Sequence, residues 1–201
     1  MKALLLLSTG IDSPVAGKLM KNKGLELIGV HFVTSKKDKK NIVIKQCELL
    51  GIKKLFVVNY FDVQKEFVDK INRRQTCIFC KRFMLKIGEK IALQEGCKYL
   101  VTGENMGQVA SQTLDNMVVL DDAVDLVVLR PLLTKDKNDT IKIANEIGSF
   151  ETSSEDKDGC WAVPRCPVTK VKLEKVKLEE KKIDVDGIID NAVKNVEIIE
   201  L

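Results

Sequence analysis

Five short apolar runs alternate with longer amphipathic segments between residues 3 and 147, and this alternation restricts the fold more than any other feature. The runs are nearly continuous leucine and β-branched residues, as in strands buried on both faces. They cover residues 3–7, 26–33, 54–59, 99–102 and 126–129. The segments between them have helical periodicity and cover residues 14–23, 37–50, 63–72, 81–94, 107–114 and 136–147. Alternating strands and helices predict an α/β fold with a doubly wound parallel sheet of about five strands.

The pattern changes after Gly148. Residues 149–170 are predicted to form a polar loop with two prolines near its end. Residues 171–201 are rich in Lys and Glu with spaced Val, Leu and Ile, which predicts one or two amphipathic surface helices. We therefore expect one domain over residues 1–170 and a C-terminal helical extension over residues 171–201, packed on the same domain.

Composition narrows the class of protein without deciding it. The apolar fraction of 45% and the charged fraction of 31% are those of an ordinary folded domain. A net charge of +4 permits a nucleic-acid partner but does not require one. No apolar run approaches the about 20 residues that span a bilayer, and the first apolar run is too short for a signal peptide. The expected location is cytoplasmic, with no membrane partner and with reduced thiols.

The turn that follows the first apolar run is typical of an anion-binding site. Residues 8–13 read Ser-Thr-Gly-Ile-Asp-Ser, and Pro14 then suits the first turn of a helix. Such a strand-to-helix turn points backbone N–H groups and the positive end of a helix dipole at one place. The turn lacks both the Walker lysine and the three-glycine dinucleotide fingerprint. Taken alone, the pattern also suits an ordinary, well-capped helix start.

Residues 8–17 resemble the SGGxDS pyrophosphate loop of the N-type ATP pyrophosphatases. More narrowly, they are similar to the ATP-pyrophosphatase domain of the tRNA 4-thiouridine sulfurtransferases, which also serve thiamine thiazole synthesis. Residues 102–104 (Thr-Gly-Glu), 107–114 and 129–132 support the narrower resemblance, as do residues 163–170. Thr9 is a departure, because the family usually has Gly there, and a position with φ > 0 would suit Thr poorly.

The resemblance implies an adenine-nucleotide-α-hydrolase-like fold and a two-step reaction. ATP is cleaved between its α and β phosphates, a substrate carbonyl is adenylated, and sulfur then displaces the adenylated oxygen. Asp12 is a candidate for holding Mg²⁺ and for a catalytic role. The implied ATP contacts are Leu6, Leu7, Ser8, Gly10, Asp12, Ser13, His31, Phe32, Arg82, Gly103 and Gln112.

Four cysteines form a second candidate site. Cys77 and Cys80 make a CxxC motif at the start of a helix, and Cys160 or Cys166 can supply a third thiol. Archaeal-type members of the family are similar in having CxxC and one distant cysteine, which hold an iron–sulfur cluster. The resemblance implies that Cys77, Cys80 and Cys160 are cluster ligands and that Cys160 is the catalytic, sulfur-carrying cysteine.

Three alternatives to a cluster remain open from the residues. All four cysteines could hold a closed structural zinc site. Cys160 and one CxxC cysteine could form a metal-free pair of persulfide and resolving thiol. All four could instead be plain buried thiols, as is expected for Cys47 and Cys97.

We therefore expect an ATP-dependent tRNA sulfurtransferase that forms 4-thiouridine. The alternatives are thiolation of a small molecule or carrier in thiamine thiazole synthesis, and a non-catalytic ATP-binding module with structural zinc. The family normally carries an N-terminal ferredoxin-like segment and a THUMP domain that grip tRNA, and some bacterial members carry a rhodanese domain. This sequence begins at the first strand and shows none of them, so we expect either that a separate RNA-binding subunit supplies this grip or that the substrate is small.

Three further expectations concern partners. The sulfur donor would be sulfide or a persulfide carrier, and the resemblance also makes a homodimer plausible. Lys36, Lys37, Lys39 and Lys40 either contact phosphate or form a solvated charged turn.

Overall fold

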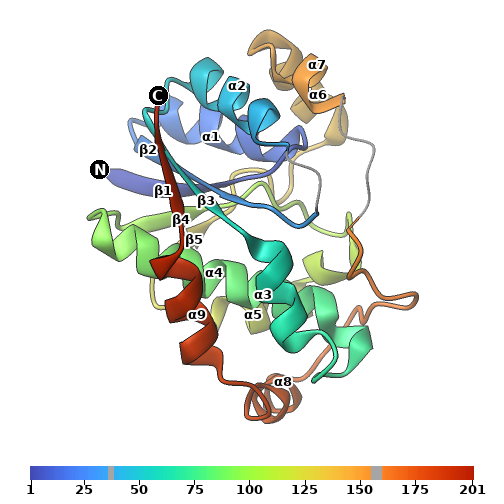
Figure 1. Ribbon diagram of the computed structural model, residues 1–201. Helices are drawn as coiled ribbons and strands as arrows, with labels where there is room; N and C mark the ends of the chain where they lie inside the picture. The colour runs from blue at the N-terminus through green and yellow to red at the C-terminus, as the bar shows by residue number, and fades with distance from the viewer. Residues whose placement is uncertain (36–38, 155–159) are drawn as a thin grey trace.

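The computed structural model describes residues 1–35, 39–154 and 160–201, and these residues build one six-stranded sheet (Figure 1). Lys36 and Lys37, two of the candidate phosphate contacts, lie outside the described residues. The strand order is β5-β4-β1-β2-β3-β6. The strands are β1 (Lys2–Leu7), β2 (Glu26–Phe32), β3 (Lys54–Val58), β4 (Tyr99–Val101), β5 (Val127–Leu129) and β6 (Glu197–Glu200).

The first five strands are mutually parallel, which confirms the predicted doubly wound α/β sheet. β1 lies at the centre and pairs with β2 on one side and with β4 on the other. The chain runs outward from β1 through β2 and β3, and then crosses back to β4. The order therefore reverses beside β1. Ligands of such sheets bind at this reversal, outside the carboxyl ends of the strands.

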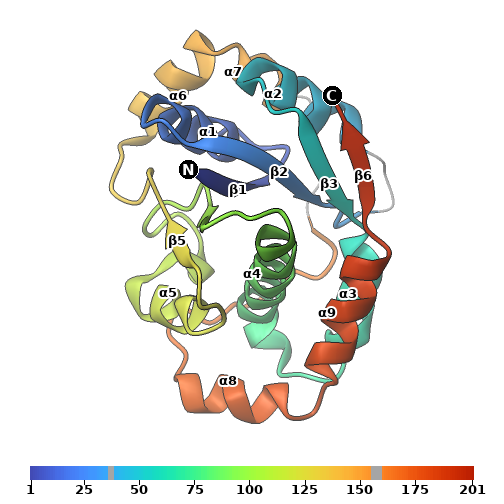
Figure 2. The same cartoon turned by 90° about the vertical axis from the view of Figure 1, so that its left-hand side faces the viewer.

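Helices cover both faces of the sheet, each over its own apolar core (Figures 1 and 2). One face carries α1 (Asp12–Asn22), α2 (Lys40–Leu50), α6 (Lys137–Glu146) and α7 (Ser149–Ser154). The other carries α3 (Tyr60–Phe67), α4 (Thr76–Gln94), α5 (Leu114–Asp121), α8 (Leu173–Glu180) and α9 (Val185–Lys194). Two 3-10 turns, η1 (Arg73–Gln75) and η2 (Ala110–Gln112), precede α4 and α5. No helix in the described ranges is long and apolar enough to cross a membrane.

Three helix predictions between β3 and β5 are displaced. α3 covers Tyr60–Phe67 and not residues 63–72. α4 begins at Thr76 rather than at residue 81, which confirms that the CxxC motif lies at the start of a helix. The helix predicted over residues 107–114 is wrong, because this segment contains only η2 and the helix begins at Leu114. The Thr113 hydroxyl accepts a hydrogen bond from the Asn116 backbone N–H at 3.3 Å, which caps the start of α5.

The C-terminal residues contain a strand that the sequence analysis missed. The two predicted amphipathic helices are present as α8 and α9, but Glu197–Glu200 form β6 and not helix. β6 lies antiparallel to β3, with Ile198 opposite Phe56 and Ile199 opposite Leu55. It covers the backbone N–H and C=O groups that β3 would otherwise expose at the sheet edge. The predicted polar loop at residues 149–170 is also wrong at its start, where α7 forms.

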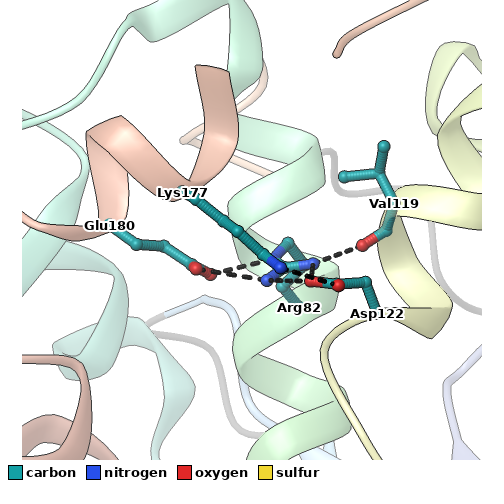
Figure 3. Close-up of polar contacts among 5 residues, drawn as sticks. All are labelled: Arg82, Val119, Asp122, Lys177 and Glu180. Carbon is teal, nitrogen blue, oxygen red and sulfur yellow. Dashed lines mark hydrogen bonds and ion pairs between the residues drawn. The ribbon is translucent and has the colours of Figure 1, made fainter. Parts of the chain in front are cut away.

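A buried arginine holds α8 against the domain (Figure 3). Arg82 of α4 donates from Nε and Nη2 to Glu180 of α8, at 2.8 and 3.1 Å. The same guanidinium pairs with Asp122 at 3.3 Å and donates to the carbonyl oxygen of Val119. Lys177 of α8 also pairs with Asp122, at 2.9 Å. Since only 2% of the Arg82 side chain is exposed, its charge depends on these partners.

Replacement of Arg82 should therefore destabilise the fold. Arg82→Met leaves Glu180 without its cation and should lower the free energy of unfolding by about 3 kcal/mol, because a buried ion pair is broken from one side. Urea denaturation followed by circular dichroism measures this change. Arg73→Met is the matched control, since Arg73 is half exposed and pairs only with Asp69, at 3.7 Å. The control should change stability by less than about 0.5 kcal/mol. Equal losses of stability in the two variants would contradict the role of Arg82 in holding α8 against the domain.

Candidate functional site

A cavity of about 340 Å³ opens at the carboxyl ends of β1, β2 and β4, at the reversal of strand order. It collects most of the positions that the resemblance assigns to ATP. These are Leu6, Leu7, Ser8, Asp12, Ser13, His31, Phe32, Gly103 and Gln112. Gly10 and Arg82 are not among its lining residues. The structure thus brings together residues from four separate stretches of the chain.

The hydroxyl groups of the loop after β1 shape its backbone. The Ser13 hydroxyl accepts from the Ser8 backbone N–H at 2.9 Å and lies 3.1 Å from the Ser8 hydroxyl. The Gly10 N–H donates to the Ser8 hydroxyl at 3.3 Å. Only glycines have positive φ among the described residues, and Gly10 is not one of them. Thr9 in place of glycine therefore costs no backbone strain.

Gly103 allows the end of β4 to approach the start of α1. A Cβ atom on Gly103 would lie 2.6 Å from the Ser13 nitrogen and 2.7 Å from the Asp12 carbonyl carbon. These are backbone atoms that cannot rotate away. The absence of a side chain at Gly103 therefore sets the width of the cavity between the loop and β4.

Polar side chains of β2 and α1 are tied to neighbouring elements. His31 Nδ1 lies 2.9 Å from the Leu7 carbonyl oxygen. Because a carbonyl oxygen only accepts, Nδ1 carries the hydrogen, and this bond joins the ends of β1 and β2. Asp12 lines the cavity, and its carboxylate accepts from Lys137 of α6 at 2.6 Å. Phe32 packs edge-on against Tyr60 at 5.4 Å and offers an aromatic surface at the cavity wall.

Glu104 is the acidic centre of a charge network at the cavity wall. Its carboxylate pairs with Lys81, accepts from Arg130 Nε at 2.8 Å and accepts from the Thr102 hydroxyl at 3.2 Å. Arg130 continues to Asp121 at 2.6 Å. Burial alone would raise the pKa of Glu104, but the charges and hydrogen bonds of Lys81 and Arg130 bring it below its usual range. The carboxylate therefore stays ionised and orients both cations.

Arg82 lies apart from the other residues that the resemblance assigns to ATP. Its guanidinium is buried among Glu180, Asp122 and the Val119 carbonyl, and the cavity cation from α4 is Lys81. Consecutive helical residues point about 100° apart, so a shift of one position exchanges the cavity for the interior. Lys81 and Glu104 are functional candidates to which the sequence analysis assigned no role. Glu104 lay within the quoted Thr-Gly-Glu motif.

Two thiols lie beside Gln64 of α3, and a third lies near them at the start of α4. Gln64 Nε2 donates to Cys80 Sγ at 3.4 Å and to Cys160 Sγ at 3.5 Å. Cys77, one turn before Cys80, is close enough to Cys160 for their charges to interact. Cys166 is exposed, and its carbonyl oxygen accepts from Arg74 at 3.3 Å. Among the described residues, no three His, Cys, Asp or Glu side chains are arranged to hold a metal ion.

Burial disfavours the thiolate form of two thiols of this cluster, Cys77 and Cys80. Burial raises the pKa of Cys80 to about 12, and Cys160 and Cys77 add to the shift against the opposing Gln64 hydrogen bond. Burial also raises the pKa of Cys77. Cys47 and Cys97, predicted in the core, are buried with pKa values raised to about 12 and about 11. Cys47 and Cys97 are therefore poor nucleophiles.

A family model described as thiamine biosynthesis protein (ThiI) matches residues 1–185. The chain belongs to this family. It is 43% identical over 206 residues to a probable tRNA sulfurtransferase of Alkaliphilus metalliredigens, covering 98% of this chain and 53% of the relative. A probable tRNA sulfurtransferase of Caldanaerobacter subterraneus is also 43% identical, over 100% of this chain and 54% of the relative. The chain therefore spans about half the length of these curated ThiI relatives.

A solved structure extends the comparison to three dimensions. The chain matches the crystal structure of a 4-thiouridine synthetase–RNA complex with bound ATP, with a TM-score of 0.93 and 31% sequence identity. The match covers 98% of this chain and 54% of that one. It confirms the ThiI resemblance that was inferred from residues 8–17 and the Thr-Gly-Glu motif.

The close approach at Gly103 gives a direct test of the cavity. Gly103→Ala should lower the free energy of unfolding by about 2 kcal/mol, because the added methyl group displaces the backbone of the α1 loop. Gly88→Ala is the control, since a Cβ there meets only side chains at 3.7 Å or more and lies within a helix. The control should be neutral or slightly stabilising, by up to about 1 kcal/mol. Urea denaturation of both variants decides the matter, and an unaffected Gly103→Ala would contradict the geometry.

Proposed function

We propose that this chain is the ATP-pyrophosphatase and sulfur-transfer part of a tRNA sulfurtransferase that forms 4-thiouridine. The observation that carries the proposal is the position of α4. This helix supplies Lys81 to the cavity that receives the β1 loop, and it supplies Cys77 and Cys80 to the thiol cluster. An ATP cavity and a sulfur site on one rigid helix suit a reaction in which adenylation precedes sulfur transfer. The ThiI relatives support this reaction.

In the adenylation step, the phosphates of ATP would meet the loop of residues 8–13 and the start of α1. Backbone N–H groups there favour anions, and Lys81 adds a cation that Glu104 orients. A carbonyl oxygen of the substrate attacks the α-phosphorus, pyrophosphate leaves, and the oxygen becomes part of a good leaving group. Asp12 lines the cavity and fits a Mg²⁺ ligand, because Mg²⁺ prefers carboxylate together with phosphate oxygens.

In the sulfur step, sulfur attacks the activated carbon and AMP leaves. Thiol sulfur is the donor type of iron–sulfur clusters, so Cys77, Cys80 and Cys160 would be the ligands of such a cluster, with zinc as the alternative. Among the described residues these side chains are not preassembled around a metal ion. When bound, such a cluster supplies sulfide as the nucleophile. In a metal-free route, a persulfide carrier would transfer its outer sulfur to Cys160 and keep its own thiol. The outer sulfur of the Cys160 persulfide would attack the activated carbon as AMP leaves, and a CxxC thiolate would then attack the Cys160 sulfur, which releases the thiolated product and leaves a disulfide. Sulfide as the donor belongs to the cluster route.

Partners follow from the same proposal. tRNA is the proposed macromolecular substrate, reached through an RNA-binding subunit, and a homodimer stays a prediction. Thiolation of a small molecule or carrier in thiamine thiazole synthesis is the second candidate, favoured by the description of the matching family.

Metal analysis tests the sulfur site. Protein purified without oxygen should contain iron and acid-labile sulfide, and Cys160→Ala should lose most of both because one of three ligands is removed. Cys166→Ala is the matched control and should keep both, since Cys166 is exposed and its backbone carbonyl, not its thiol, accepts from Arg74. Elemental analysis gives the result. Zinc without iron would favour the closed structural site, and absence of both metals would favour the persulfide route.

Nucleotide binding and turnover test the ATP site. Lys81→Met should weaken ATP binding about tenfold, because a charge-assisted contact to phosphate is lost. Calorimetry measures the affinity, and release of AMP and pyrophosphate in the presence of tRNA measures turnover. Lys86→Met is the control, since Lys86 lies on the same helix but does not line the cavity. Unchanged affinity in Lys81→Met would rule out its phosphate contact. ATP binding without any AMP or pyrophosphate would instead indicate a nucleotide-sensing module.

A further inference from the structure

Gln64 of α3 is the buried polar residue at the centre of the thiol cluster. Its side chain is 1% exposed. Its Nε2 donates to Cys80 Sγ and Cys160 Sγ at 3.4 and 3.5 Å, and its Oε1 accepts from Trp161 Nε1 at 2.8 Å. One side chain therefore joins α3, α4 and the segment that begins at Cys160.

The direction of the Gln64 amide is fixed by its neighbours. An indole N–H can only donate, so the atom facing Trp161 must be the amide oxygen. The NH₂ group must then face the two sulfur atoms, and it has one hydrogen for each. Both N–H donors and one of the two lone pairs of the amide oxygen are used. A buried amide that turns both hydrogens toward sulfur favours sulfur that acts as an acceptor, as in thiolate, persulfide or sulfide.

The two cysteines differ in how they are held. Cys80 belongs to α4, and its backbone carbonyl accepts from the buried Tyr60 hydroxyl at 2.7 Å. Cys160 belongs to no helix or strand. It is held through Gln64 and through Trp161, whose ring lies 5.5 Å from that of Phe61. The position of Cys160 relative to the CxxC motif therefore depends on Gln64.

We propose that Gln64 is a positioning residue of the sulfur site, which holds the Cys160 sulfur beside the Cys80 sulfur with an N–H directed at each. Trp161 orients the Gln64 amide for this role. The inference rests on the proposed function for its chemical purpose. The juxtaposition of the two thiols can be measured without ATP, RNA or metal, so its failure and the failure of the proposed function are distinguishable.

Disulfide formation between Cys80 and Cys160 reports the juxtaposition. The azo compound diamide oxidises two thiols to one disulfide, and its N=N bond takes up the two hydrogens. The full chain is used after dialysis against a chelator, in a Cys77→Ser background. Trypsin then releases Cys80 and Cys160 on separate peptides, because Lys81 and Arg165 end them. The rate at which the joined peptide appears is measured by mass spectrometry at fixed pH and diamide concentration.

Gln64→Met should slow this disulfide about tenfold, because it keeps the length of the side chain but removes both donors. Gln46→Met is the matched control. Gln46 is also fully buried, but it lies on α2 and donates to Ser153 at 3.3 Å, on the opposite face of the sheet. The control should leave the rate unchanged.

A second variant tests the proposal even if Gln64→Met does not fold. Trp161→Phe retains a ring against Phe61 and removes only the N–H that orients Gln64, at a residue that is 44% exposed. It should slow the disulfide in the same direction. Combining it with Gln64→Met should add nothing, since both act through one amide. Wild-type rates in folded Gln64→Met, or in Trp161→Phe if Gln64→Met is unfolded, would overturn the proposal. Additive losses in the double variant would overturn the role of Trp161.

Discussion

The burial of α4 against the sheet is the constraint on which the rest of the structure depends. Its apolar side chains belong to the larger core, where Phe83 stacks on Phe67 at 4.8 Å. With the helix fixed in rotation, three consecutive residues point in three directions. Cys80 faces the thiol cluster, Lys81 lines the cavity after β1, and Arg82 faces α8. The proposed sulfur site, the proposed phosphate site and the attachment of α8 therefore all depend on the position of one helix.

The two sites beside α4 differ in charge. At the cavity, Glu104 is surrounded by Lys81, Arg130 and the Thr102 hydroxyl, so its ionised form is favoured. At the thiol cluster, Gln64 supplies only neutral N–H donors, and burial keeps the Cys80 thiol protonated. A site that receives phosphate needs fixed cations beforehand. A site that receives sulfur or a metal can remain neutral until its ligand arrives, because loading removes the thiol protons.

The sequence predicts those parts of the fold that depend on local pattern. Runs of buried strand residues and the loop after β1 are local, and they were located within a few residues. The sequence could not show that Lys81 lines the cavity while Arg82 faces α8, because the contacts of a helical residue depend on the rotation of the helix as well as on position along the chain. β6 was missed because a short Ile-containing segment becomes a strand only when a distant edge accepts it. The role of Gln64 has no local signal at all, since its partners are 16 and 96 residues away.

The C-terminal residues support the two helices that carry the proposed sulfur site. α9 packs against both α3 and α4, and β6, which follows α9, pairs with β3. α3 carries Gln64 and α4 carries Cys80, so the covered edge and α9 stabilise the spacing of the two helices. Arg82 and Glu180 fasten the same C-terminal segment at its other end. Because the sulfur contacts are hydrogen bonds of 3.4 and 3.5 Å, they tolerate little displacement of either helix. α9 and β6 thus stabilise the spacing between α3 and α4, which the Gln64 amide bridges through its contact with Cys80.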